Sequence, residues 1–122
     1  MRPADRPTTR SIGQAGEELA ASFLAARGLA ILARNVRYRF GEIDIVARDG
    51  DTLVFVEVRL RRSQRYGGAI ESITAAKRLR MHRAIGAYLS GRRSPPPCRV
   101  DAVLLDRLED PRIEWLRDIL QE

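Results

Sequence analysis

The stretch from Gly41 to Arg59 constrains the fold of this chain more than any other part of the sequence. Two runs with alternating side chains flank the turn Asp49-Gly50-Asp51. Such alternation is typical of strands, and glycine adopts the positive φ that a tight turn requires. The sequence therefore predicts two antiparallel strands joined by a short loop. In the first strand, one face is predicted to carry Ile43, Ile45 and Ala47.

Two carboxylates, Asp44 and Glu57, are predicted to converge on one face of this hairpin. An Asp49-Gly50 loop makes them diagonal neighbours, with Cβ atoms about 7–8 Å apart. A Gly50-Asp51 loop, or a loop of all four residues 49–52, places them directly opposite each other at roughly 5 Å. Arg59 shares the face of Glu57, because side chains alternate along a strand.

Like charges at this separation are unfavourable unless one acid is protonated or a cation lies between them. A hard divalent ion with oxygen ligands removes the repulsion, so the pair is a candidate metal site. Two solvated acids on an exposed sheet face are the alternative. Leu53 and Phe55 share the face of Glu57 and favour partial burial instead.

Composition indicates one soluble domain with an anionic partner. The chain has 122 residues, 44% hydrophobic and 31% charged, which suits a single globular core. Its lone cysteine, Cys98, and lone histidine, His82, exclude an internal disulfide and a histidine-rich zinc site. The net charge of +6 favours nucleic acid as partner. We expect a cytoplasmic protein without a membrane segment, because no apolar leader or spanning stretch is present.

The remaining segments predict further helices and strands. Residues 1–10 are expected to be a mobile arm, and residues 11–122 one domain. A helix is predicted from Ser11 to Arg27 and a strand from Leu29 to Arg39. Glu17 lies at the edge of the helix's apolar stripe, so it is the glutamate that can reach a site. The alternative for Glu17 is an ordinary first-turn acid favoured by the helix dipole.

A second helix is predicted from Ser72 or Thr74 to about Ser90, and two of its sides are partly apolar. One stripe comprises Leu79, Ile85 and Leu89 with His82 among them; the other comprises Met81, Ala84 and Tyr88, with Lys77 at its N-terminal end. A helix with two apolar sides is either well buried or contacts a partner, so a homodimer is an open alternative. All but one of the 22 basic residues are arginine, which singles out Lys77.

Basic residues follow the hairpin and continue on the second helix. We expect them to contact phosphates of a nucleic acid; the alternative is a solvated charge run. The candidates are Arg61, Arg62, Arg65, Arg78 and Arg80. A buried strand is predicted from Arg99 to Asp106, in which the role of Asp101 is open, and Ile113 to Leu116 is predicted to be a last strand or a short helix.

These motifs, taken in order, resemble a known bacterial family. G-E-I-D at Gly41 to Asp44, followed by F-V-E-V-R at Phe55 to Arg59, resembles the PD-(D/E)xK nuclease signature. With G-x-x-G-E ending at Glu17, Arg34-Asn35, Lys77 and R-V-D-A-V from Arg99, the chain resembles the YraN-type family. That family is grouped with Holliday-junction-resolvase-like endonucleases, and the resemblance covers about residues 12–116.

The resemblance implies a restriction-endonuclease-like α/β fold, a mixed sheet flanked by helices. It also implies a metal-dependent DNA endonuclease, with branched or repair-intermediate DNA among the candidate substrates. Asp44 and Glu57 would be ligands of Mg²⁺ or Mn²⁺, and Glu17 a supporting carboxylate. Arg59 departs from the pattern, which has lysine there. Arginine cannot act as a general base, although it can bind phosphate and stabilise negative charge.

Lys77 could supply the missing amine if its helix points it into the site. Two other functions are compatible with the sequence. One is a nucleic-acid-binding module that keeps the nuclease fold without turnover, motivated by Arg59. The other is an adaptor dimer, motivated by the two apolar sides of the second helix.

Overall fold

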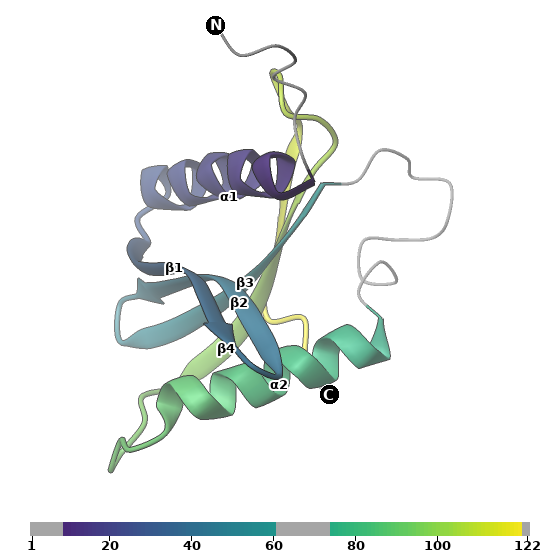
Figure 1. Ribbon diagram of the computed structural model, residues 1–122. Coiled ribbons are helices and arrows are strands. Elements are labelled where there is room, and N and C mark those ends of the chain that lie inside the picture. The colour runs from purple at the N-terminus through teal and green to yellow at the C-terminus, as the bar shows by residue number, and fades with distance from the viewer. Residues whose placement is uncertain (1–8, 61–73, 121–122) are drawn as a thin grey trace, which may run out of the picture.

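Two helices cover opposite faces of a mixed β-sheet (Figure 1). The computed structural model describes residues 9–60 and 74–120. The helices are α1 (Thr9–Ala26) and α2 (Ala75–Leu89). The strands are β1 (Ala30–Tyr38), β2 (Gly41–Asp49), β3 (Thr52–Leu60), β4 (Cys98–Leu105) and β5 (Ile113–Leu116). No helix within the described ranges is long and apolar enough to cross a membrane.

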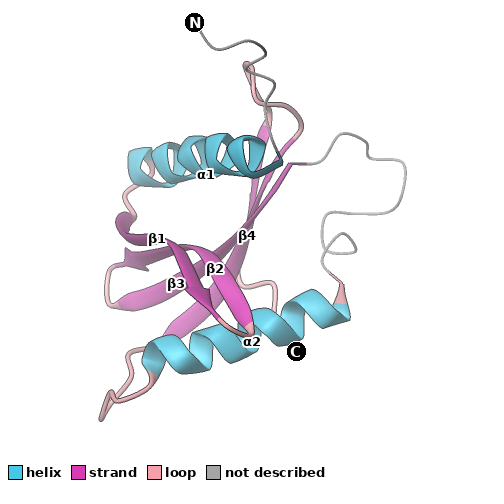
Figure 2. Ribbon diagram, viewed as in Figure 1, coloured by secondary structure: helices cyan, strands magenta, loops and turns pink. Residues whose placement is uncertain are grey.

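The five strands lie in the sheet in chain order, β1-β2-β3-β4-β5 (Figure 2). Neighbouring strands are antiparallel except β3 and β4, which are parallel. Parallel neighbours need a crossover connection, and α2 lies in the connection between these two strands. This architecture confirms the predicted mixed sheet flanked by helices and is consistent with a restriction-endonuclease-like fold. The segment from Ile113 to Leu116 is a strand, which decides between the two predicted conformations.

Each helix buries one face of the sheet in a separate core. The core below α1 contains Ala20, Ala21, Leu24, Leu29, Ile45, Ala47, Val54, Val56, Val103 and Leu105. The core below α2 contains Ile43, Val46, Leu53, Phe55, Met81, Ala84 and Val100. Burying one large aliphatic or aromatic side chain stabilises the fold by about 1.5–3 kcal/mol. Both faces of β2 and β3 are therefore held in place by apolar packing.

Helix α2 begins at Thr74, whose side-chain oxygen accepts a hydrogen bond from the backbone nitrogen of Lys77 at 3.1 Å. This confirms Thr74 as one of the two predicted N-caps. The helix buries Met81 and Ala84 against the sheet. The stripe predicted around Leu79 and His82 is wrong at these two residues, which are exposed. The other two members of that stripe, Ile85 and Leu89, pack beside Met81 against the core below α2.

The loop between β2 and β3 consists of Gly50 and Asp51, because Asp49 pairs with Thr52. Gly50 adopts a φ of 60°, as the turn requires. Of the three predicted loops, this one is observed. The last pair of this register is Ile45 with Val56, so Asp44 and Glu57 are the residues that directly follow the paired region.

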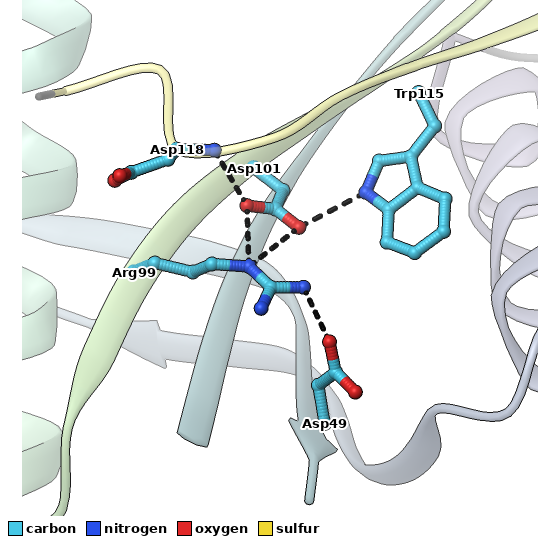
Figure 3. A network of polar contacts seen from close by, with 5 residues as sticks. All are labelled: Asp49, Arg99, Asp101, Trp115 and Asp118. Carbon is cyan, nitrogen blue, oxygen red and sulfur yellow. Dashed lines mark hydrogen bonds and ion pairs between the residues drawn. The ribbon is translucent and has the colours of Figure 1, made fainter.

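A buried aspartate, Asp101, holds the C-terminal segment to β4 (Figure 3). Its carboxylate accepts hydrogen bonds from Arg99 Nε, from Trp115 Nε1 at 2.9 Å and from the backbone nitrogen of Asp118 at 2.9 Å. Arg99 also forms an ion pair with Asp49 at 2.9 Å, which connects β4 to β2. Asp101, whose role the sequence leaves open, is therefore a partner of Arg99.

Candidate functional site

Asp44 stands where the regular structure of β2 breaks. Ile45 belongs to the core below α1, whereas Ile43 belongs to the core below α2. The prediction that Ile43 and Ile45 share a face is therefore wrong. The physical reason is that the pairing of β2 with β3 stops at Ile45. Beyond that point, Asp44 Oδ2 accepts a hydrogen bond from the backbone nitrogen of Val58 at 2.9 Å.

The strand on the other side of β2 is also distorted at this level. Arg34 pairs with Ile45 and Val36 pairs with Ile43, so Asn35 lies opposite Asp44. Asn35 has a φ of 53°, in the left-handed region. Asparagine tolerates this region better than most residues. Unusual backbone conformations often cluster at functional sites, and this one flanks a candidate site residue.

Glu57, the acid next to Asp44 in the site, is deeply buried, with 2% of the residue exposed. It lies on the α2 side of β3, one position after Val56 of the opposite core. The ammonium group of Lys77 forms an ion pair with Glu57 Oε1. Helix α2 therefore points Lys77 into the site, which is the condition that the sequence left open.

The environment disfavours charge on the carboxyl groups of the site. Burial raises the pKa of Glu57 to about 7; the charge of Asp44 adds to this rise and Lys77 opposes it. Burial also raises the pKa of Asp44, although the Val58 hydrogen bond and the charge of Lys77 act in the opposite direction. A hydrogen bond between the two carboxyl groups lowers the pKa of Asp44 and raises that of Glu57.

Glu17 of α1 belongs to the same electrostatic cluster. Burial raises its pKa to about 7, with a further contribution from Asp44, while Arg34 opposes the rise. Its Oε1 atom is buried and has no hydrogen-bond partner among the described residues. Glu17 is therefore buried, in keeping with its place at the edge of the apolar stripe, whereas its neighbour Glu18 is exposed.

The other predicted site residues are placed as follows. Arg59 is half-buried on β3, and the regular pairing with β4 keeps it on the face of Glu57. Arg78 and Arg80 are exposed on α2. The predicted phosphate contacts Arg61, Arg62 and Arg65 lie outside the described residues. The structure thus brings Asp44, Glu57 and Lys77 into contact.

A pocket of about 600 Å³ opens beside Glu57, between the β1–β2 turn and α2. Glu57 and Lys77 form part of its lining. The remaining lining is mostly basic and aromatic: Arg37, Tyr38, Arg39, Phe40, Gly41, Glu42, Arg80, Met81 and Arg83. Sequence reasoning missed the aromatic pair of this pocket. The run Tyr38-Arg39-Phe40 just before the G-E-I-D motif could have indicated it.

Gly41, the first residue of that motif, lies directly against the backbone of α2. A Cβ atom at this position would collide with the backbone carbonyl of Arg80 on α2. The β1–β2 turn therefore packs directly on the helix backbone, and only glycine permits this approach.

The donor set fits one hard divalent cation. No group of three or more His, Cys, Asp or Glu residues in the described ranges is arranged to hold a metal ion. Mg²⁺, however, is usually bound by one or two carboxylates and completes its shell with water and substrate phosphate. Asp44 and Glu57 provide such a pair. Burial is the main cause of the raised pKa of both groups, and a bound cation would favour their charged forms.

The sheet order and the flanking helices define a mixed α/β protein, consistent with a restriction-endonuclease-like fold. Residues 16–105 match the uncharacterised protein family UPF0102, and the chain belongs to that family.

Relatives match over most of the chain. A UPF0102 protein of Nitrosomonas europaea is 49% identical over 110 residues, which cover 90% of this chain and 93% of the relative. A UPF0102 protein of Symbiobacterium thermophilum is 52% identical over 106 residues, covering 86% and 90% respectively. UPF0102 is the YraN family, so these relatives confirm the family predicted from the sequence. Their names assign no activity.

Proposed function

We propose that the protein is a metal-dependent endonuclease that hydrolyses phosphodiester bonds in DNA. One observation carries the proposal: two interacting carboxyl groups, the half-buried Asp44 and the buried Glu57, lie with Lys77 beside a pocket rich in arginine. Buried acids are costly unless they have a function or a partner. An acidic pair next to basic residues suits a metal ion and a phosphate together.

The residues have distinct roles in this proposal. Asp44 and Glu57 hold Mg²⁺ or Mn²⁺, which would supply a water of lowered pKa and polarise the phosphate. The hydrogen bond from Val58 fixes the orientation of Asp44. Lys77 is close enough to Glu57 to contact a phosphate oxygen bound at the same point, where its charge stabilises negative charge that develops during reaction.

Glu17 is placed to hold a proton. With a pKa raised to about 7 and a buried oxygen without a hydrogen-bond partner in the described residues, it can exchange a proton near neutral pH. Arg59 lies on the same face as Glu57. Its role is to bind phosphate and not to transfer a proton, because the guanidinium group stays protonated.

Cleavage of plasmid and of synthetic branched DNA with Mn²⁺ tests the proposal. Wild type should nick or cut at least one substrate, whereas Asp44→Asn and Glu57→Gln should lose this activity while still binding DNA. Glu18→Gln is the matched control, because Glu18 is an exposed acid of α1. Equal cutting by wild type and both site variants would refute the proposal.

A second function, nucleic-acid binding without turnover, is favoured by Arg59 in the position where related nucleases carry lysine. It predicts salt-sensitive binding of DNA without cleavage. Arg59→Lys separates the two functions: a binding module stays inactive after this change, whereas a nuclease keeps or gains activity.

A further inference from the structure

We infer that the pocket between the β1–β2 turn and α2 binds an unpaired nucleobase together with its neighbouring phosphates. This inference deepens the proposed function, since the pocket shares Glu57 and Lys77 with the candidate site. Phe40 is the stacking surface for the base, and the arginines of the pocket contact the phosphates. The substrate class is therefore DNA with an unpaired nucleotide beside the scissile bond.

The first observation is an exposed aromatic ring at the pocket. Phe40 is 44% exposed, which makes it one of the few large hydrophobic residues on the described surface. It stacks on Tyr38 with ring centroids 5.8 Å apart and an interplanar angle of 5°. Parallel stacking keeps the two rings in a fixed orientation and extends the flat aromatic surface. A base can continue such a stack, because every base has a π-face.

The second observation is the charge around that ring. The pocket is lined by five basic residues, Arg37, Arg39, Lys77, Arg80 and Arg83, against two acids, Glu42 and Glu57. Arg37 pairs with Glu42 at 3.6 Å, and both side chains are at least half exposed. Such surface pairs contribute little energy and are easily exchanged for a phosphate. A ligand that combines a flat ring with negative charge fits this lining, and a nucleotide has both.

The third observation is the shape of the pocket. Its volume of about 600 Å³ lies within the range of roughly 300–1,000 Å³ that is typical of small-ligand sites. The contact of Gly41 with the Arg80 backbone fixes the turn that carries Phe40. Phe40 therefore lies next to a residue that packs directly on α2, and its turn is held against the helix.

These observations favour an unpaired nucleotide over a regular duplex. Bases inside a duplex are already stacked on their neighbours, so their faces are closed to a side chain. The phosphate backbone of a duplex would contact the arginines but would leave the exposed part of the Phe40 ring uncovered. A single strand, a flap or a branch point offers both features.

Binding of oligonucleotides in EDTA tests the inference without any cleavage. The probes are a 12-nucleotide single strand with a central 2-aminopurine, a fork that carries the same base unpaired, and a blunt duplex. Wild type should quench 2-aminopurine fluorescence in the first two probes, because stacking quenches it. Phe40→Ala should weaken binding of both roughly tenfold and remove the quench, while duplex binding changes less than twofold. Phe40→Trp should restore the quench.

Leu32→Ala is the matched control, because Leu32 is a similarly exposed hydrophobic residue of β1 that does not line the pocket. An unchanged quench in Phe40→Ala, or an equal loss of duplex binding, would overturn the inference. A matched RNA strand separates DNA from RNA preference. If Phe40 is dispensable but Asp44→Asn abolishes cleavage, the inference fails and the nuclease stands. If Phe40 is required but no substrate is cut, the pocket stands and the nuclease fails.

Discussion

Lys77 of α2 forms an ion pair with Glu57 of β3, and this contact connects the crossover helix to the paired carboxyl groups. The side chain of Lys77 is 29% exposed, whereas that of Glu57 is almost fully buried. The amine can therefore meet a ligand from the pocket while it neutralises an acid at the base of the site. It also places an amine near the position where Arg59 replaces the expected lysine.

We predict that Lys77→Met lowers the cleavage rate by about 10²-fold or more, because a positive charge aimed at developing negative charge contributes on that order. Lys77→Arg should restore part of the rate, since the charge is kept. Initial rates on a branched substrate with saturating Mn²⁺ measure the effect. Arg83→Met is the control, because it removes another pocket cation. Equal losses in Lys77→Met and Arg83→Met would show that Lys77 acts only through general charge.

Glu17 predicts a pH-dependent effect on stability. Its pKa is raised from 4.5 to about 7 in the folded state. The folded protein holds a proton that the unfolded chain has already lost between these values, so stability falls as pH rises from about 4.5 to about 7. Glu17→Gln removes this pH-dependent loss of stability, because glutamine does not ionise. We expect its melting temperature to exceed that of wild type by roughly 5 °C at pH 8 and to show no such gain at pH 4.5.

Thermal unfolding monitored by circular dichroism checks this result at both pH values. Glu18→Gln removes the same charge from the exposed position next to it and should show no pH-dependent gain. A gain for Glu17→Gln that is equal at both pH values would contradict the assigned cause.

The Asp101 network predicts a large loss of stability. Asp101→Ala leaves Arg99, Trp115 Nε1 and the Asp118 backbone nitrogen without their acceptor. Breaking a buried ion pair by removing one partner costs about 3–5 kcal/mol. Urea denaturation followed by the fluorescence of Trp115 measures the change. Asp118→Asn is the control, because only the backbone of Asp118 takes part and asparagine tolerates its φ of 56°. A loss below 1 kcal/mol in Asp101→Ala would exclude the network as a major stabiliser.

Much of this structure could be predicted from sequence because local patterns decide it. Alternating residues indicate the strands, Gly50 indicates the turn, and Thr74 indicates the start of α2. The loop length remained open among three alternatives, since two aspartates flank Gly50 and each loop satisfies its positive φ. The placement of Glu17 followed from helix periodicity, which requires no knowledge of the rest of the chain.

The sequence predictions that proved wrong or incomplete concern features that depend on contacts between helices and strands. Alternation placed Ile43 with Ile45, but β2 leaves its ladder at Asp44 and the pattern reverses there. The two apolar stripes on α2 look equivalent in the sequence. In the structure Ile85 and Leu89 still reach the core below α2, whereas Leu79 is exposed. The run Tyr38-Arg39-Phe40 shows two aromatic residues near each other, but their stacking and the close approach of Gly41 to α2 are visible only in the structure.

The break at Asp44 leads to the last prediction, which concerns Asn35. This residue lies opposite Asp44 in the left-handed region, with a φ of 53°. Asn35→Val should destabilise the protein by about 1–2 kcal/mol, because a side chain branched at Cβ is strained there. Asn35→Gly should be tolerated, because glycine adopts this conformation freely. The same distortion holds β1 against the segment that positions Asp44, so Asn35→Val should also reduce Mn²⁺ affinity. Calorimetric titration with Mn²⁺ on folded samples separates the two effects: a variant that is less stable but binds Mn²⁺ as wild type does would limit the role of Asn35 to folding.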